Sequence, residues 1–286
     1  MVYDMAVWAL SDLQDDWGTF NQPHAEAASL SAVILRHMAE GTSAQRKLTA
    51  HLICPVSPAY AQRIANQLVE HANQRLEVGH ITATTDLDIE PADLDLTIST
   101  VPTKSASHTL VISPFPTEHD FQAVTTTCAD IQHQRGLRML SLYFRYYLRE
   151  ATFIRARGQR TRSEVLDEVC KVLAREELVT ERFREQLERR ERIDSTSFAH
   201  VVALPHTCTS SVRHNAISVY LSDTPVPWGA DAVNLVVVIA IERELLRDFY
   251  AIYEMCIETL SKPANTVTML GATGTQDFIE RLEKLA

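Results

Sequence analysis

The sequence predicts an α/β fold in two domains, the first with a small parallel sheet and the second with a mixed sheet, preceded by a short helical segment. The chain has 286 residues, more than the usual size of a single hydrophobic core. From residue 48 onward, short apolar strand patterns alternate with helical patterns, as is typical of α/β sheets. A capping-box pattern at Thr161 and Glu164 then opens a second unit of the same kind.

The first 46 residues have the Ala-rich apolar spacing of a helix, which breaks at Gly41, and they are too few for a domain. The first domain is expected over residues 47–133. Its short strands and helices alternate along the chain, so a parallel sheet is predicted. The expected strands are 48–54, 76–82, 94–100 and 109–113, and the expected helices run from Pro58 to about Gln74 and from about Thr117 to Gln134.

Residues 134–147 are rich in arginine and are interpreted as a linker to the second domain, expected over 148–286. The capping box begins a helix with valine and leucine on one side, and a charged helix with Phe183 and Leu187 inward follows. The stretch 233–241 contains a continuous apolar run from Leu235, which predicts a strand buried on both faces. The other expected elements are strands 198–206 and 216–221, a turn over 224–231, and helices near Asp248–Leu260 and Thr275–Leu285.

The composition predicts a soluble, cytoplasmic protein with no cofactor. Hydrophobic residues make up 45% of the chain, which is ordinary for a folded protein. The opening MVYDMAVW has no basic signal-peptide region, and the longest near-apolar run, Leu235 to Ile241, is shorter than the roughly 20 residues that cross a bilayer. The five cysteines are widely spaced and contain no CxxC pair, so reduced thiols are expected.

The charge is distributed unevenly along the chain. Residues 1–133 hold 6 Lys and Arg against 16 Asp and Glu, whereas the remainder holds 21 of each, so the net charge of −10 lies entirely in the first half. Nucleic-acid affinity depends largely on basic side chains that neutralise phosphates. The arginines between Arg135 and Arg192 are interleaved with acids, which favours a solvated helical face. We therefore expect no direct nucleic-acid binding by this chain.

One histidine is a candidate for covalent phosphoryl chemistry. The alternating stretch 198–206 predicts a strand, and Pro205 lacks a backbone donor and should end it, so His206 is expected at the surface. A histidine presented at the end of a strand is typical of a phosphoryl acceptor. The alternative is an ordinary histidine in a surface loop. Hydroxyl groups that could solvate an anion follow on Thr207, Thr209, Ser210 and Ser211.

Cys54 is a second candidate, because it lies where the first strand ends and a helix begins. Backbone N–H groups and the helix dipole stabilise an anion there, and they lower a cysteine pKa from about 8.5 to generate a nucleophilic thiolate. The following loop, with Ser57, Ala59 and Tyr60, is the candidate phosphate loop. The alternative is that Cys54 is a buried, inert small hydrophobic residue.

A metal site is a rival reading of the His206 region. Four possible ligands lie within fifteen residues, His200, His206, Cys208 and His214. Their spacing, H-x5-H-x-C-x5-H, matches no common zinc pattern, so no metal is predicted.

Three motifs over roughly residues 148–286, RERIDSTSFAHVVALPH, PVPWGADAVNLVVVIAI and TGTQDFIERL, resemble an enzyme IIA domain of the mannitol/fructose type from the bacterial phosphotransferase system. The resemblance implies that His206, in Ala203-Leu-Pro-His206, accepts phosphate from the carrier protein HPr. It also implies that Arg190, followed by Thr196, binds the phosphate, which fits because a planar guanidinium matches phosphate oxygens. Pairing of Arg190 with neighbouring glutamates is the alternative.

Residues 47–133, with ICPVSPAYA, DLDLTISTVP and VISPFPTEHD, resemble the enzyme IIB domain of the galactitol/lichenan type that is fused into sugar-responsive regulators. The resemblance implies phosphate on Cys54. The chain departs from this family in the cysteine loop, where Ser57 and Ala59 stand at the usual glycine positions and Pro55 and Pro58 remove N–H donors.

The order of these parts resembles the C-terminal region of an activator or antiterminator with phosphotransferase regulation domains, of the mannitol-operon activator type, with residues 1–46 as the remnant of such a domain. The implied function is a phosphorylation-responsive regulatory region that carries phosphate and is not a free-standing enzyme. Implied partners are HPr, a transporter enzyme IIB and the regulator's own upstream regulation and DNA-binding domains, with a homodimer left open. The alternative is a phosphorylation-silent docking module, which is favoured by the altered Cys54 loop and by Phe249 where many IIA domains have a second histidine. The intact Arg190, Thr196 and His206 favour the phosphorylated switch. Val201 and Val33, at family glycine and histidine positions, are further departures from the family pattern.

Overall fold

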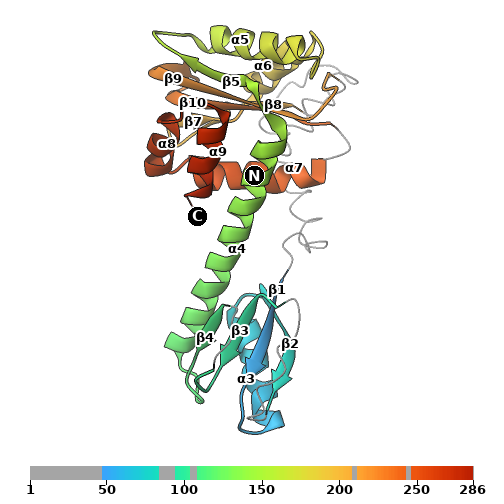
Figure 1. Ribbon diagram of the computed structural model, residues 1–286, viewed down its shortest axis with the longest axis vertical. Coiled ribbons are helices and arrows are strands. Elements are labelled where there is room, and N and C mark those ends of the chain that lie inside the picture. The colour runs from blue at the N-terminus through green and yellow to red at the C-terminus, as the bar shows by residue number, and fades with distance from the viewer. Residues whose placement is uncertain (1–46, 84–93, 104–107, 208–210, 243–245, 286) are drawn as a thin grey trace. The chain divides into compact units, whose positions relative to one another are not determined.

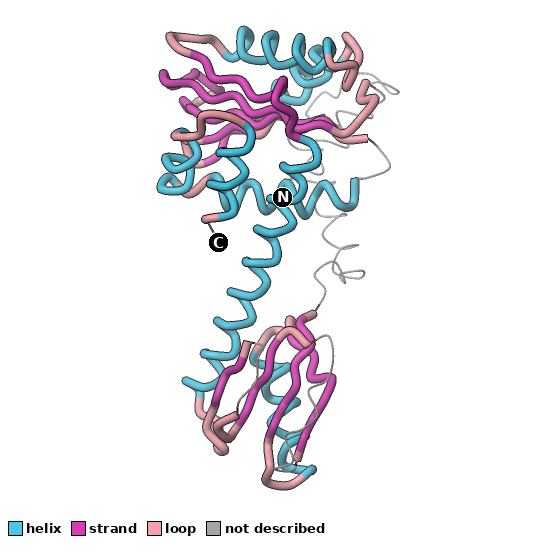
Figure 2. The backbone as a smooth tube through the Cα atoms, viewed as in Figure 1, coloured by secondary structure: helices cyan, strands magenta, loops and turns pink. Residues whose placement is uncertain are grey.

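The computed structural model describes residues 47–83, 94–103, 108–207, 211–242 and 246–285, with backbone alone for 246–251. The helix expected over residues 1–46, and Val33 within it, lie outside the described residues. The described chain divides into two compact units, one ending at Arg135 and the other beginning at Gly136 (Figures 1 and 2).

The first unit contains a four-stranded sheet in the order β2-β1-β3-β4, with every neighbouring pair parallel. The parallel sheet predicted from the sequence is confirmed. Because parallel strands share one direction, their carboxyl ends meet at one edge, and Cys54 directly follows β1 there. The strands are β1 Leu48–Ile53, β2 Leu76–Thr82, β3 Leu96–Ser99 and β4 Thr109–Val111.

Two helices pack on this sheet. Helix α3 (Pro58–His71) begins where the Ser57 hydroxyl accepts from the backbone N–H of Tyr60, with a proline at the first helical position. Its apolar stripe, from Ala61 to Leu68, joins the core of the unit, as does Phe121 near the start of the 30-residue helix α4 (Glu118–Tyr147).

The region interpreted as a linker, 134–147, is the second half of α4 and is fully helical. Gly136 does not end the helix. A Cβ at that position would collide with the side chain of Met255, so the glycine permits close approach to another helix of the second unit. Leu140 and Phe144 continue from α4 into the core of that unit.

The second unit is an α/β sandwich around a mixed sheet in the order β5-β9-β10-β7-β6, with β8 also paired to β10. The mixed sheet is confirmed: β9 and β10 are antiparallel, whereas β5 runs parallel to β9 and β7 and β8 run parallel to β10. The strands are β5 Leu148–Ala156, β6 Ser197–Phe198, β7 Val202–Ala203, β8 His206–Thr207, β9 Ala216–Trp228 and β10 Asp231–Ala240.

Helices cover both faces of this sheet (Figure 1). One face packs on α5 (Arg162–Arg175) and α6 (Phe183–Ile193). The other packs on the end of α4 and on the C-terminal helices. These are α7 Leu246–Leu260, α8 Pro263–Leu270 and α9 Thr275–Glu283. Side chains from alternate positions of β10 enter each core, as expected for a strand buried on both faces.

Two predictions in this unit are wrong. The stretch 198–206 is not one strand, because Ala199 and His200 both adopt positive φ, 49° and 57°, in a tight turn between the antiparallel strands β6 and β7. The expected turn over 224–231 is also shorter than predicted. Strand β9 continues to Trp228 and only Gly229 and Ala230 connect it to β10.

The prolines of that stretch are compatible with a strand for a topological reason. Beyond Ser222, β9 pairs with β10 alone, so Pro225 and Pro227 lie where one side of the strand has no neighbour. Strand β5 and helix α8 were not predicted. None of the described helices combines the length and apolar character needed to span a bilayer.

Candidate functional site

His206 opens β8 and is paired in register with Ile239 of β10. Its side chain is 1% exposed, so the prediction of a surface imidazole is wrong. Pro205 does not end the pairing, because its carbonyl accepts from the backbone N–H of Ile239 at 2.9 Å and the chain stays against β10. The candidate acceptor is therefore held inside the sandwich.

One ring nitrogen of His206 has a defined role. Its Nδ1 lies 3.0 Å from the carbonyl oxygen of Leu204. A carbonyl only accepts hydrogen bonds, so Nδ1 carries the proton. In the neutral imidazole the lone pair is then on Nε2.

An aromatic side chain that the sequence analysis missed packs against this imidazole. The ring of Tyr253, from α7, is 4.4 Å from the ring of His206 and is tilted by 59°. Tyr253 is itself buried and also contacts Phe198 edge-on. No local signal marks Tyr253, because its place beside His206 follows from the packing of α7 on the sheet.

Arg190 lies in the last turn of α6, the helix that packs against β8. Its guanidinium is buried, and Nη1 donates to the carbonyl oxygen of Asp194 at 2.8 Å. A buried guanidinium on a helix that contacts the strand of His206 is suited to binding an anion.

The neighbouring Glu191 is the second site residue that the sequence analysis missed. Its carboxylate accepts from the Thr196 hydroxyl, from the Thr196 backbone N–H at 3.4 Å, and from Trp228 Nε1 at 2.9 Å. Burial raises the pKa of Glu191, and the Thr196 hydroxyl, the charge of Arg190 and the Trp228 indole oppose this increase. The predicted phosphate residue Thr196 is therefore bonded to Glu191, and the carboxylate ties α6 to the end of β9.

Of the hydroxyl residues after the histidine, Thr207 is described and buried next to His206. Ser211 is also buried, and its carbonyl accepts from the backbone N–H of Thr180. Thr209 and Ser210 lie outside the described residues.

The rival metal site gains no support. His200 is largely exposed at the turn between β6 and β7 and pairs with Asp231, whereas His206 is buried. Among the described residues, no group of three or more His, Cys, Asp or Glu side chains could hold a metal ion. Cys208 lies outside those residues.

In the first unit, Cys54 is 0% exposed. Its backbone N–H donates to Thr82 at the end of β2. The predicted phosphate-loop residues Ser57 and Ala59 are exposed, and the Tyr60 hydroxyl donates to the carbonyl of Pro114. Cys54 is thus buried while the loop that follows it is exposed, as in the buried-cysteine alternative.

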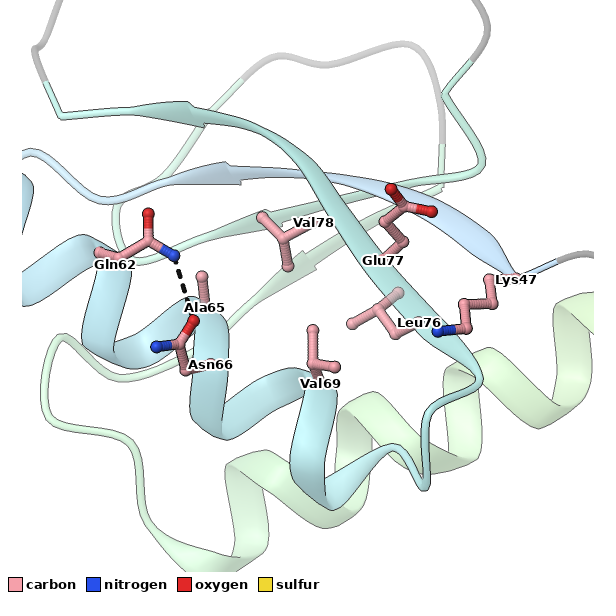
Figure 3. A pocket seen from close by; sticks show the side chains of 8 residues that line it. All are labelled: Lys47, Gln62, Ala65, Asn66, Val69, Leu76, Glu77 and Val78. Atoms are coloured by element: carbon pink, nitrogen blue, oxygen red, sulfur yellow. Dashed lines mark hydrogen bonds between the residues drawn. The ribbon is translucent and has the colours of Figure 1, made fainter.

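The first unit also has a shallow pocket of about 330 Å³ between α3 and β2 (Figure 3). Lys47 and Leu76 line it at the amino ends of β1 and β2, whereas Cys54 follows the carboxyl end of β1. Six strand residues separate these ends, roughly 20 Å at 3.3 Å per residue. The pocket contains none of the predicted site residues. Its other lining residues are Gln62, Ala65, Asn66, Val69, Glu77 and Val78.

Phe249, at the position where many IIA domains have a second histidine, lies in α7. Only its backbone is described.

Residues 147–285 match the family described as "Phosphoenolpyruvate-dependent sugar phosphotransferase system, EIIA 2". A curated relative, the "Probable licABCH operon regulator" of Bacillus subtilis (strain 168), is 22% identical over 233 residues. The match covers 78% of this chain and 35% of the relative, so the chain spans about a third of that protein's length.

Similar solved structures include the nitrogen regulatory protein IIA-Ntr from Neisseria meningitidis, with 15% identity and a TM-score of 0.43 over 47% of this chain and 94% of that one. IIA mannitol from Escherichia coli has 16% identity and a TM-score of 0.40 over 47% of this chain and 98% of that one.

Proposed function

We propose that this chain is the phosphorylation-responsive region of a sugar-operon transcriptional regulator, in which His206 accepts a phosphoryl group from HPr. The observation that supports this most is the hydrogen bond between His206 Nδ1 and the Leu204 carbonyl, at 3.0 Å. It leaves the lone pair on Nε2, the atom that would attack phosphorus. The match of residues 147–285 to the EIIA family supports the phosphotransferase system as the source of the phosphoryl group.

The transfer is an in-line displacement. A bond forms between His206 Nε2 and phosphorus while the bond from phosphorus to the carrier's histidine nitrogen breaks, and that nitrogen keeps the electron pair. Arg190 would balance the charge on the equatorial oxygens, because α6 packs against the acceptor strand. The Thr196 hydroxyl is already bonded to Glu191, and Thr207, which follows His206 in β8, is the other hydroxyl residue proposed for the site.

The burial of His206 gives this reaction a structural consequence. Phosphorylation adds a charge of about −1.5 to −2, which exceeds the single positive charge of Arg190, and unpaired buried charge is costly, so a rearrangement is expected. The Tyr253 side chain lies against the imidazole and is a candidate for the group that moves when the carrier approaches. Phosphorylation would then change the packing of α7 and, through it, the surface that the domain presents to partners.

The regulatory part of the proposal rests on the similarity to the operon regulator. That match covers 78% of this chain, more than residues 147–285 alone, so it includes part of the chain before the EIIA-like region. In the first unit, Cys54 follows β1, an inner strand of a parallel sheet, and the resemblance to an enzyme IIB domain supports it as a second acceptor. Proposed partners are HPr, a transporter enzyme IIB, and upstream regulation and DNA-binding domains, all in the cytoplasm.

A second candidate function is a docking module in which neither site is phosphorylated. The burial of both predicted acceptors, His206 and Cys54, favours it. In that case the two domains would serve as surfaces that partners recognise without covalent change.

One experiment separates these functions. The chain is incubated with phosphoenolpyruvate, enzyme I and HPr, and its intact mass is measured beside a control IIA domain. The proposal predicts the mass of one added phosphoryl group for His206, and of a second where Cys54 also accepts. An unchanged mass, under conditions that label the control, would leave the docking module as the function.

A further inference from the structure

We infer that Glu191 is a positioning residue for His206, acting through a chain of hydrogen bonds that fixes the acceptor imidazole. This inference rests on the proposed function, because Glu191 would position the His206 nitrogen that takes the phosphoryl group. The longest-range of these bonds joins Glu191 to Trp228, 37 residues away in the sequence.

The chain of bonds begins at the end of β9. Trp228 Nε1 donates to Glu191 Oε2 at 2.9 Å, and the Thr196 hydroxyl donates to the other carboxylate oxygen, Oε1. The Thr196 backbone N–H also donates to Oε2, at 3.4 Å. Glu191 therefore fixes both the side chain and the backbone of Thr196.

From Thr196 the chain of bonds reaches the imidazole. The Thr196 carbonyl accepts from the backbone N–H of Leu204 at 3.0 Å. The Leu204 carbonyl in turn accepts from His206 Nδ1, also at 3.0 Å. The partner of one ring nitrogen determines which nitrogen keeps its lone pair, so the position of the Leu204 carbonyl determines which one is nucleophilic.

The environment of Glu191 fits a positioning role better than a role in general packing. The side chain is 4% exposed, and every bond given above is shielded from water. Hydrogen bonds are stronger in the protein interior than in water, and losing one there is costly. Arg190, the candidate phosphate ligand, is the preceding residue, so one turn of α6 carries both groups. Loss of the carboxylate would release Thr196, whose carbonyl holds Leu204, the residue that binds His206 Nδ1.

The test reads the imidazole directly. Long-range ¹H–¹⁵N NMR of the whole chain reports which nitrogen of His206 is protonated, and His206→Ala assigns the signals. The wild type should show the Nδ1–H form. Glu191→Ala should shift the population towards Nε2–H. Glu191→Gln should restore Nδ1–H, because its amide oxygen can accept from Trp228 and its amide N–H can donate to Thr196.

A matched control lies on the same helix. Among the described residues, Glu188 bonds Arg162 and Arg184, each at 2.9 Å, and no member of the Glu191 chain. Glu188→Ala should leave the His206 signals unchanged. In phosphorylation with enzyme I and HPr, Glu191→Ala should slow labelling about tenfold, as loss of a residue that orients a functional histidine commonly does, and Glu188→Ala should not.

Three results would overturn the inference: unchanged His206 signals in Glu191→Ala, an equal shift in Glu188→Ala, or no recovery in Glu191→Gln. If Glu191→Ala does not fold, Thr196→Val decides, because it removes the hydroxyl bonded to Glu191 and should shift the signals the same way. If the signals shift as expected but the wild type is never phosphorylated, the positioning role stands and the proposed function fails.

Discussion

Tyr253 and His206 face each other inside the second unit, with ring centroids 4.4 Å apart and both side chains about 1% exposed. The tyrosine comes from α7 and the histidine from β8, so the contact joins a helix to the strand of the candidate acceptor. Access to His206 therefore depends on the packing of α7.

Replacing Tyr253 should expose the imidazole. Tyr253→Leu removes the ring, so His206 should react faster with diethylpyrocarbonate, which modifies unprotonated imidazole nitrogens. Tyr253→Phe keeps the ring and is the matched control, with a rate close to wild type. Peptide mass mapping measures the modified fraction of His206 over time. Equal rates in the leucine and phenylalanine variants would show that Tyr253 does not limit access.

Cys54 should be unreactive in the folded protein, because its side chain is fully buried. Cys128 and Cys170 serve as internal controls: burial raises the pKa of Cys128 to about 11 and that of Cys170 to about 12. At pH 8 we expect slow alkylation of all three, and rapid alkylation in denaturant. Selective labelling of native Cys54, read by peptide mass mapping, would instead identify an accessible thiolate and strengthen its case as an acceptor.

The pH dependence of stability should report the buried carboxyl of Glu191. Its pKa is raised, so the folded state binds a proton more readily than the unfolded state. The contribution of this group to the free energy of unfolding therefore decreases as the pH rises above the unfolded value of about 4.3. Glu191→Gln lacks this titration and should gain stability relative to wild type between pH 5 and pH 8. Denaturation midpoints at the two pH values measure this, and a relative loss for Glu191→Gln would contradict it.

The turn between β9 and β10 requires glycine at position 229. Its φ is +64°, and an added Cβ would lie 2.9 Å from Ser195 Oγ. Gly229→Ala should lower the free energy of unfolding by about 1–3 kcal/mol, the usual cost of a left-handed non-glycine residue. Gly158→Ala is the control, because its φ is +82° and the surrounding space is open. Thermal melts compare the two variants, and Gly229→Ala should lose more stability than Gly158→Ala. An equal or smaller loss for Gly229→Ala would show that contact with Ser195 adds no cost.

The sequence predicted the elements that have strong local patterns. Such patterns mark the parallel strands of the first unit, the capping box at Thr161 and the doubly buried strand β10. Strand β5 was missed because its pairing with β9 shifts register between Leu148 and Phe153, which breaks the alternation of buried and exposed residues. The turn at Ala199 and His200 has no glycine or asparagine to mark its positive φ.

The site was only partly predictable for a similar reason. His206 and Arg190 were identified from the motif around them, whereas Glu191 bonds Trp228, which is 37 residues away in the sequence. The burial of His206 depends on pairing with β10 and on packing by α6 and α7. Contacts of this kind belong to the tertiary fold and leave no local pattern in the sequence.

The most direct test of the central claim is site-resolved phosphorylation of the wild type, His206→Ala, Cys54→Ala and the double variant by phosphoenolpyruvate, enzyme I and HPr. Intact mass is measured before and after acid treatment, because phosphoryl–nitrogen bonds are acid-labile. The account predicts an acid-labile phosphoryl group that is kept in Cys54→Ala and lost in His206→Ala. Labelling that persists unchanged in His206→Ala, or no labelling of the wild type, would contradict it.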